Sequence, residues 1–394
     1  MAGALQGLKV IELGHVISVP FASALMADFG AEVIKIEVPG VGDGLRNMCK
    51  IKNMFFAVEG RNKKCITLNL QKEKGKEILR SLLAEADVMI ENYRPGVLAK
   101  LGFGWEELQK INPRLSLVSV SGFGQTGPYR NRPGYDSVGM AMGGLTYVSG
   151  SPDGPPVRPG LAIGDYVTGL FAALGTMFAI YARDSQGLNK GQIVDISLYE
   201  SVFRLMETAV IEYSYNGTVK ERVGNGHPAT VPSGHFQTKD GKWVVVTSGN
   251  DKIFANLCKC MNRPEWLEKP EFKTQTDRLA IRAYIDKETK EFILQHTLEE
   301  LLDIFKQDVP VAPIYSIEDI FNDPQYQSRN DILELETENF GKIKMQGIVP
   351  KMSMTPGELK WAGAGEMGYH NEEVYTGMGF TKEEIERMRE EKII

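Results

Sequence analysis

Cysteine is scarce in this sequence, and no motif ties the few cysteines together. There are four in 394 residues: Cys49, Cys65, Cys258 and Cys260. They form no CxxC pair, and the Cys258-x-Cys260 spacing lacks the histidine or cysteine partners of a zinc site. We therefore expect reduced, buried thiols, with no disulfide framework and no metal site.

The chain also lacks a strong excess of charge and a secretory leader. Its formal net charge of −6 offers no general attraction to nucleic acid or to an anionic membrane surface. Residues 1–8 show no basic segment, apolar run or small-residue cleavage site of a signal peptide. The sequence predicts a cytoplasmic protein that binds neither nucleic acid nor membrane.

Long hydrophobic runs are missing except for one. Residues 166–182 are uncharged and approach the length of a membrane span, but they contain Gly169 and Gly175 and follow an acidic residue. No second run of this kind follows as a partner. A buried core helix is the prediction, and a membrane span is the alternative.

What the sequence does contain is an alternation of apolar strand and helix patterns. Strands are predicted at 8–13, 31–37, 65–70, 88–91 and 115–121, and helices at 21–29, 74–85 and 105–111. Strands that alternate with helices predict an α/β fold with a doubly wound, mainly parallel, Rossmann-like sheet. A helix at 166–183, a strand at 192–197 and a helix at 198–213 complete this large domain over 1–213.

Glycine and proline then mark a change of domain. We predict a linker at 214–225, a smaller α/β domain at 226–314, a second linker at 315–334, and a segment at 335–394 that completes the large domain. The small domain is predicted to contain a strand at 242–247 and helices at 251–261, 278–295 and 297–308. Capping boxes at Thr297 and Thr381, each with glutamate three residues on, mark two helix starts.

Ligands of such sheets bind beyond the carboxyl ends of the strands, but the usual nucleotide motifs are missing there. The first loop, residues 14–20, contains no GxGxxG, and no GxxxxGK[ST] occurs in the chain. There is no GxSxG, and the five histidines are scattered. These absences speak against dinucleotide binding and against a serine triad.

One acid stands where a carboxylate could do chemistry. Asp165 follows Gly164 and precedes the apolar helix, the position of an N-cap held ionised by the helix macrodipole. Such a carboxylate can attack an activated acyl group, although capping alone explains the residue equally well. His15 in the first loop is a second candidate, and Arg94, Lys100 and Arg132 lie where they could meet phosphates or simply be solvated.

Several segments, taken together, resemble the family III (CaiB/BaiF-type) CoA-transferases, including the formyl-CoA and carnitine CoA-transferases. The resemblance extends over essentially the whole chain and is carried by residues 7–20, 30–37, 91–96, 121–128, 134–136, 164–165 and 190–192. It implies transfer of coenzyme A from an acyl-CoA donor to a carboxylic acid acceptor. Acyl-CoA is then a substrate, and no cofactor is permanently bound.

The resemblance also implies the chemistry. Asp165 occupies the place of the family's catalytic aspartate, which forms a mixed anhydride and then an aspartyl-CoA thioester. Both intermediates must be kept from water, and residues 224–234 lie where a covering lid is expected. Members of the family form two interlocked rings, which implies a homodimer whose two linkers are crossing segments.

Contacts to coenzyme A are implied position by position. They involve His15, Val16, Ile17, Val38, Leu68, Gln71, Asn92, Tyr93, Arg94, Lys100, Tyr135 and Asp136. Val38 and Gln71 replace an arginine and a lysine of the formyl-CoA transferases, so phosphate recognition is expected to depend more on Arg94 and Lys100. Ile17 replaces a glutamine near the acyl group, which lowers the expectation of oxalate or formate.

Two alternatives stay open. The family includes α-methylacyl-CoA racemases, but Tyr135 stands at their histidine position, and a phenol with a pKa near 10 replaces imidazole poorly. A non-catalytic acyl-CoA-binding protein, in which Asp165 only caps a helix, is the other. Ile17, Met140, Met142 and Tyr147 hint at a less polar acyl group than formyl, or else belong to the core.

Overall fold

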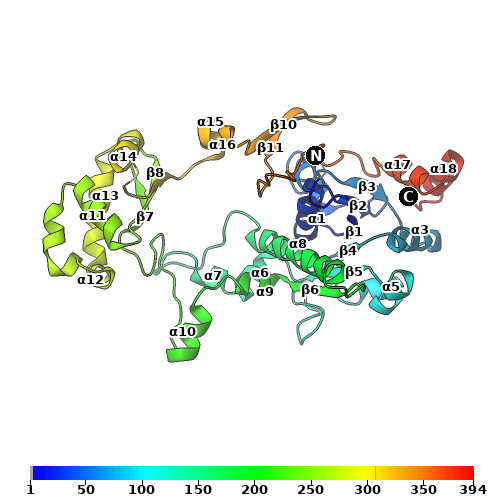
Figure 1. Cartoon of the computed structure of the whole chain (residues 1–394), viewed down its shortest axis with the longest axis horizontal. Helices are drawn as coiled ribbons and strands as arrows, with labels where there is room; N and C mark the ends of the chain where they lie inside the picture. Colours follow the sequence, from blue (N-terminus) through cyan, green and yellow to red (C-terminus); the bar gives the residue numbers. More distant parts are fainter. Residues whose placement is uncertain (1–2, 307) are drawn as a thin grey trace. The chain divides into compact units, whose positions relative to one another are not determined.

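The computed structural model describes residues 3–306 and 308–394 and divides the chain into two compact units (Figure 1). The first unit comprises Met1–Leu145, Pro159–Ile211 and Tyr326–Ile394, and the second comprises Thr146–Arg158 and Glu212–Gln325. This division differs from the predicted boundaries, because 146–158 groups with the second unit. The stretches predicted as linkers also contain helices, namely α10 (Ala209–Asn216), α15 (Ile317–Asn322) and α16 (Pro324–Ser328).

The first unit is built on a six-stranded sheet in the order β3-β2-β1-β4-β5-β6. All five strand pairs are parallel. The strands are β1 (Lys9–Leu13), β2 (Glu32–Glu37), β3 (Lys64–Thr67), β4 (Val88–Glu91), β5 (Ser116–Ser121) and β6 (Ile193–Ser197). The predicted doubly wound parallel sheet is confirmed, and its strand order reverses between β1 and β4.

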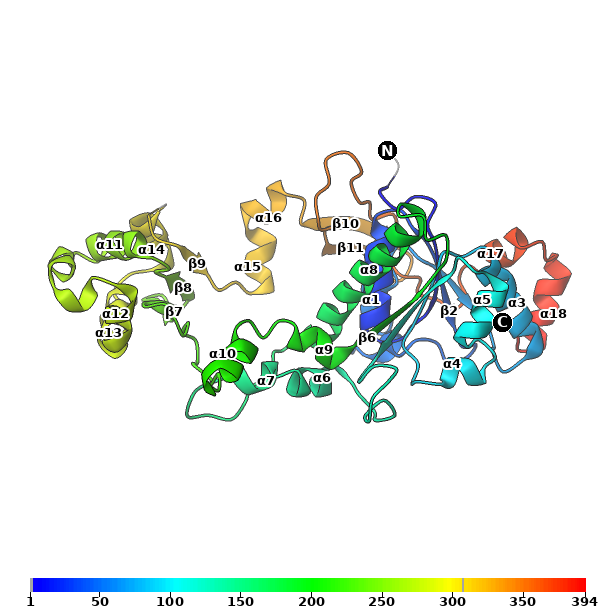
Figure 2. The ribbon, with the colours of Figure 1, turned by 60° about the horizontal axis from the view of Figure 1, so that its bottom comes forward.

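Alternate side chains of these strands enter two separate cores, as the two-residue period of a strand requires. In β1, β4 and β5 the even-numbered residues, such as Val10 and Val118, pack with α1 (Ser18–Asp28) and α8 (Ile163–Asp184), and β2 contributes the odd-numbered Val33 to this core. The odd-numbered residues of the same three strands, such as Ile11 and Leu117, pack with helices on the opposite face: α3 (Glu73–Ala84), α5 (Trp105–Ile111), α17 (Asn371–Gly377) and α18 (Lys382–Glu390). Figure 2 shows α1 and α8 running side by side along their face.

The C-terminal segment closes the free edge of the sheet at β3. The backbone N–H of Cys65 donates to His370 Nδ1 at 3.0 Å, and that of Thr67 donates to Asn371 Oδ1 at 2.9 Å. These side chains satisfy donors that an edge strand leaves unpaired. The first unit also contains the hairpin of β10 (Ile332–Thr337) and β11 (Gly341–Gln346) and the short helices α2 (Met54–Glu59) and α4 (Val97–Lys100).

Two predicted helix boundaries around β6 were wrong. Helix α8 begins at Ile163, three residues before the predicted start, and α6 (Asp136–Met142) precedes it. The helix predicted at 198–213 breaks into α9 (Leu198–Phe203) and α10, with Glu207 in the left-handed region at φ 47° between them. Apolar periodicity continues across the break, which is why the sequence did not reveal it.

The second unit has a three-stranded antiparallel sheet in the order β7-β8-β9. Its strands are β7 (Ser233–Gln237), β8 (Trp243–Thr247) and β9 (Val311–Pro313), and its helices are α7 (Leu145–Val148, shared with the first unit), α11 (Asp251–Cys260), α12 (Gln275–Ala280), α13 (Arg282–Leu294) and α14 (Leu298–Phe305). Trp266 and Phe272 stack in its core at 4.8 Å. The capping boxes predicted at Thr297 and Thr381 are confirmed, whereas the helix predicted at 278–295 is interrupted at Ile281.

Two expectations from composition concern α8 and the thiols. Within the described ranges, α8 is the one helix long and apolar enough to cross a membrane, and it packs against α1, β5 and β6.

All four cysteines are free thiols. The prediction that they are buried was wrong for Cys49, which is exposed in the irregular segment between β2 and α2.

Candidate active site

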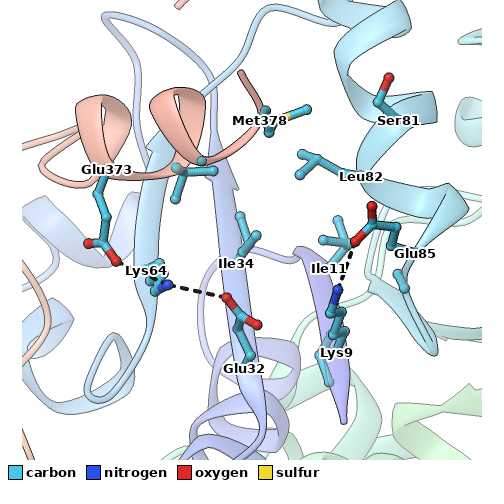
Figure 3. Close-up of a pocket in the computed structure, with 14 residues that line it drawn as sticks. Lys9, Ile11, Glu32, Ile34, Lys64, Ser81, Leu82, Glu85, Glu373 and Met378 are labelled. Carbon is cyan, nitrogen blue, oxygen red and sulfur yellow. Dashed lines mark hydrogen bonds and ion pairs between the residues drawn. The ribbon is translucent and has the colours of Figure 1, made fainter. Parts of the chain in front are cut away.

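A cavity of about 480 Å³ lies at the amino ends of β1, β2 and β3 (Figure 3). Its rim is charged: Lys9 pairs with Glu85 at 2.8 Å, and Lys64 pairs with Glu32 at 3.2 Å and with Glu373 at 3.0 Å. Ligands of parallel α/β sheets bind at the opposite, carboxyl edge. The candidate active site is therefore sought there, where the predicted residues lie.

The loop after β1 is held by a buried network of charges. Lys35 Nζ lies 2.7 Å from Glu12 Oε1, 2.7 Å from Asp43 Oδ2 and 2.8 Å from the carbonyl oxygen of Gly14. Asp43 in turn accepts the backbone N–H of Val16 at 3.0 Å. Val16 has φ 66°, an unfavourable conformation for a β-branched residue, and this hydrogen bond helps to hold it.

A second lysine completes the network. Lys63 Nζ contacts Glu12 Oε2 at 2.8 Å and the carbonyl oxygen of Pro20 at 2.7 Å, so it links the sheet to the start of α1. Ser23 donates to the same carboxylate at 2.6 Å. Burial favours the protonated form of Glu12, but the two lysines outweigh burial and hold its pKa at about 2.

The loops after β1 and β4 are clamped together by one amide side chain. Asn92 Oδ1 accepts the N–H of His15 at 3.0 Å, and Asn92 Nδ2 donates to the carbonyl of His15 at 2.7 Å. The His15 ring lies 5.6 Å from the Tyr93 ring, and burial lowers the pKa of His15, which keeps it neutral near pH 7. Because its amide is already occupied, Asn92 acts here as a brace for His15.

Asp165 is the third residue of α8, in its first turn. The predicted N-cap role was wrong, since Ala162 occupies that position and makes no side-chain cap. The prediction of a fully ionised carboxylate was also wrong. Burial raises the pKa of Asp165 to about 7, and the neighbouring charge of Asp136 contributes to the rise. Asp165 is 9 % exposed, so burial outweighs the helix dipole that the sequence argument relied on.

Asp136, the first residue of α6, fixes the start of α8. Its Oδ1 accepts the backbone N–H of Asp165 at 3.2 Å. A side chain at Gly164 would bring Cβ to 3.1 Å from Asp136 Oδ1 and 3.1 Å from Met140 Cγ. Glycine before Asp165 is what allows the two helices to approach this closely.

Tyr166, the next residue, joins α8 to two other elements. Its hydroxyl donates to Glu59 Oε1 of α2 at 3.0 Å, and its ring meets Phe21 of α1 edge-on at 4.8 Å. Tyr166 and Ala162 pack with Ile17 and Phe56 in a small apolar cluster. The first loop and the start of α8 therefore share one wall beside Asp165.

The remaining residues predicted to contact coenzyme A all lie in the first unit. Val38 is 49 % and Tyr135 69 % exposed, and Gln71, Arg94 and Lys100 are also exposed. Leu68 has a buried side chain, so only its backbone is free to face a ligand. Of the residues suggested for the acyl group, Ile17 and Met140 are buried and Met142 is 45 % exposed. Tyr147 belongs to the second unit and donates to Glu221 at 2.8 Å.

The predicted lid, 224–234, lies wholly in the second unit, where it is tied to α12 and α13. Arg282 donates to the carbonyl oxygens of His227 at 2.7 Å and Pro228 at 3.2 Å. Gln275 donates to the carbonyl oxygen of Ala229 at 2.9 Å. The segment is therefore anchored within its own unit.

Sequence reasoning missed Glu12, Lys35, Asp43, Glu59 and Lys63. Charged residues inside strands could have signalled the Glu12–Lys35 pair, because a strand buried on both faces is normally apolar throughout. Glu59 carried no signal, since it ends a six-residue helix that periodicity did not detect.

Comparison with known proteins assigns the family. Residues 5–371 match the sequence model of the CoA-transferase family III. A succinyl-CoA–D-citramalate CoA-transferase of Chloroflexus aurantiacus is 40 % identical over 396 residues, covering 99 % of this chain and 98 % of the relative. An acetyl-CoA:oxalate CoA-transferase of Acetobacter aceti is 38 % identical, covering 89 % and 90 %.

A mouse (Mus musculus) succinyl-CoA:glutarate CoA-transferase is 35 % identical, covering 89 % of this chain and 80 % of the relative. The crystal structure of a CaiB/BaiF family protein from Brucella suis superposes with a TM-score of 0.84 at 31 % identity, over 96 % of this chain and 100 % of that one. The chain belongs to the family III CoA-transferases and is an enzyme that transfers coenzyme A between an acyl-CoA and a carboxylic acid.

Proposed function

We propose that Asp165 is the nucleophile of this transfer and carries both covalent intermediates. An Asp165 carboxylate oxygen attacks the donor thioester carbonyl, the C–S bond breaks, and its electron pair leaves on the sulfur of coenzyme A. The thiolate then attacks the Asp165 carbonyl carbon of the mixed anhydride, which releases the donor acid as its carboxylate and leaves an aspartyl-CoA thioester. The acceptor carboxylate repeats the two steps in reverse order, so no proton is gained or lost overall.

The observation that supports this role is the environment of Asp165. A buried carboxylate that no cation stabilises is poorly solvated, and poor solvation of the charged form makes it a better nucleophile. Within residues 3–306 and 308–394, the only charge that shifts the pKa of Asp165 is that of Asp136. The same burial protects an anhydride or thioester on Asp165 from water.

Coenzyme A is proposed to lie along the carboxyl edge from β3 to β4. Arg94 and Lys100 are exposed, and neither forms an ion pair within the described part of the chain, which leaves both free for phosphates. The exposed Val38, Gln71 and Tyr135 would border the ligand. His15, Val16, Ile17 and Tyr93 would approach its thioester end, with Leu68 contributing backbone, Asn92 bracing the loop, and Asp136 bordering Asp165.

We further propose that the enzyme works as a homodimer in the cytoplasm. Leu170, Leu174, Phe178 and Tyr181 repeat at helical spacing along α8 and are 53 %, 46 %, 63 % and 61 % exposed. An apolar stripe of this length is typical of an interface. Four free thiols accord with a reducing compartment.

Trapping the intermediate tests the proposal. The protein is incubated with acyl-CoA and then with hydroxylamine, and a hydroxamate on the peptide containing Asp165 is the expected product. Asp165→Asn should lose transfer by at least about a thousandfold, as expected when a nucleophile is removed, while exposed Asp153→Asn should retain it. Retained transfer in Asp165→Asn with no adduct would overturn the assignment. Deuterium exchange at the α-carbon of a 2-methylacyl-CoA without any acceptor acid would indicate the racemase instead.

A further inference from the structure

A second cavity, of about 350 Å³, is lined by the end of β10 with the turn that follows it, 336–340, and by 361–365 and 369–370 of the C-terminal segment. Both stretches belong to the first unit. The volume lies within the range of small-molecule sites, about 300–1,000 Å³. None of the lining residues is among those proposed above for the transfer reaction. Any ligand of this cavity is therefore selected by its own walls.

The wall formed by the C-terminal segment is fixed to the edge of the large sheet. Trp361 Nε1 donates to the carbonyl oxygen of Lys63 at 3.2 Å. His370 Nδ1 accepts the backbone N–H of Cys65, and the backbone N–H of His370 donates to the Cys65 carbonyl oxygen at 3.0 Å. The Trp361 indole and the His370 imidazole are therefore held in place before any ligand binds, which lowers the entropy cost of binding.

The hairpin turn packs against this wall and closes the cavity. The Tyr369 hydroxyl donates to Glu338 Oε1 at 2.9 Å, a hydrogen bond that joins the two walls. The Asn339 amide occupies the space beside Gly365, where a Cβ would collide with it. Glycine at position 365 therefore allows the turn to approach the segment this closely.

Aromatic rings make up much of the lining. Trp361 is 36 % and Tyr369 is 50 % exposed, so both rings offer surface to a ligand. The His370 ring centroid lies 4.9 Å from that of Tyr369 and 6.4 Å from that of Trp361. Phe340 lines the cavity from the hairpin side. The face of an aromatic ring is electrically negative, so a group of neighbouring rings attracts a cation that can contact their faces.

The charged groups of the lining are all negative. Glu336 and Glu338 contribute two carboxylates, and among the described residues that line the cavity there is neither lysine nor arginine. Burial lowers the pKa of His370, which keeps that ring neutral near pH 7. The cross-strand neighbour of Glu336, Lys342, pairs with Glu334 at 2.6 Å. A positively charged ligand would therefore meet no competing cation in this lining.

Aromatic rings and carboxylates together select among cations. A bare ammonium group is compact and strongly hydrated, whereas an ammonium that carries methyl groups is larger and presents an apolar shell to a ring face. We propose that this cavity binds small organic cations with a quaternary, methylated ammonium group, which contacts Trp361 and Tyr369 while Glu336 and Glu338 supply the opposite charge. The site uses none of the residues proposed for the transfer reaction.

Three matched compounds test the proposal on the wild-type protein. Choline carries the quaternary ammonium group, ethanolamine is the same molecule with a bare ammonium group, and 3,3-dimethylbutan-1-ol has the shape of choline without its charge. Isothermal titration at neutral pH and constant ionic strength measures the three dissociation constants. We expect choline to bind at least about fivefold more tightly than either of the other two. Choline that binds no better than the neutral alcohol or ethanolamine, or that does not bind at millimolar concentration, overturns the proposal.

Two substitutions with matched controls locate the binding. Tyr369→Leu removes one ring, and Glu338→Gln removes a charge but keeps an acceptor for the Tyr369 hydroxyl, so each should weaken choline binding at least about threefold. The controls are Tyr147→Leu and Glu221→Gln, because Tyr147 donates to Glu221 at 2.8 Å in the second unit, the same kind of contact outside the cavity. Both controls should bind choline as the wild type does, and thermal unfolding shows which variants are folded. Unchanged binding in either folded cavity variant, or equal weakening in the controls, overturns the proposed site.

Discussion

Asp136 accepts the backbone N–H of Asp165 at 3.2 Å, and the charge of the same carboxylate helps to raise the pKa of the Asp165 side chain. One residue therefore both positions the proposed nucleophile and destabilises its ionised form. Burial is the larger cause of that destabilisation. The pair links the geometry of two helices, α6 and α8, to the acid–base behaviour of the site.

The first prediction concerns the pH dependence of transfer. Only ionised Asp165 is nucleophilic, so kcat/KM should rise with pH through a midpoint near 7, the pKa of the free protein. Asp136→Asn retains an oxygen for the Asp165 N–H and removes the charge, so it should move the midpoint to lower pH. Initial rates from pH 5.5 to 8.5 measure both, with exposed Asp153→Asn as control. A rate that is flat or falls over this range contradicts the assignment.

The second prediction concerns stability. The pKa of Asp165 rises from 3.8 to about 7 on folding, so its ionised form destabilises the folded state increasingly as pH rises between these values. Asp165→Asn removes this effect. The variant should gain on the order of 4 kcal/mol over wild type at pH 8, because each pKa unit corresponds to about 1.4 kcal/mol, and little at pH 4. Urea unfolding at both pH values measures the gain, and an equal gain at both would be inconsistent with this cause.

The third prediction separates the bracing role of Asn92 from simple stability. Asn92→Ala frees the N–H and carbonyl of His15 and should cost about 1–3 kcal/mol in the free energy of unfolding. It should also raise the KM for acyl-CoA. Asn112→Ala is the matched control, since the Asn112 amide donates to the carbonyls of Leu83 and Ala86 at 3.1 Å and 2.8 Å. We expect Asn112→Ala to lose a similar amount of stability while its KM for acyl-CoA stays unchanged. An equal rise of KM in both variants would show that KM follows stability alone.

Much of the fold could be predicted because local pattern determined it. The strand at 88–91 and the helix at 105–111 match β4 and α5 at both ends, since glycine, proline and charged residues mark their limits. The break between α9 and α10 could not be predicted. An apolar period spans it, and only the packing of α9 on α6 and α8 shows where the helix stops.

The site shows the same limit. A glycine–aspartate start before an apolar helix correctly singled out Asp165 as a residue at a helix beginning. From the sequence we predicted an ionised Asp165 carboxylate, because the helix dipole and helix capping are local effects that depend on neighbouring residues in the chain. Burial and the approach of Asp136, 29 positions away, are tertiary effects, and these raise the pKa.

The fourth prediction tests the buried charge network. Lys63→Met leaves the Glu12 carboxylate with one lysine instead of two and should cost about 3–5 kcal/mol. Lys64→Met, which removes two exposed ion pairs, should cost less than about 1 kcal/mol. In wild type the pKa of Glu12 falls from 4.5 to about 2 on folding, so its stabilisation is complete above pH 4.5 and is lost as pH falls towards 2. Acid unfolding that is no earlier in Lys63→Met than in Lys64→Met would contradict this.

The last prediction concerns the apolar stripe of α8. Leu174 and Phe178 lie one turn apart at its centre, so charges placed there would be buried without partners if a second copy covers the stripe. Leu174→Glu/Phe178→Glu should therefore convert a dimer to monomers in sedimentation velocity at micromolar concentration. Met354→Glu, at a position that is 76 % exposed in the first unit, should leave the dimer intact. Because these side chains are exposed on α8, the double variant should still fold. A folded double variant that remains dimeric would show that another surface holds the subunits together. A monomeric wild type would refute the proposed dimer.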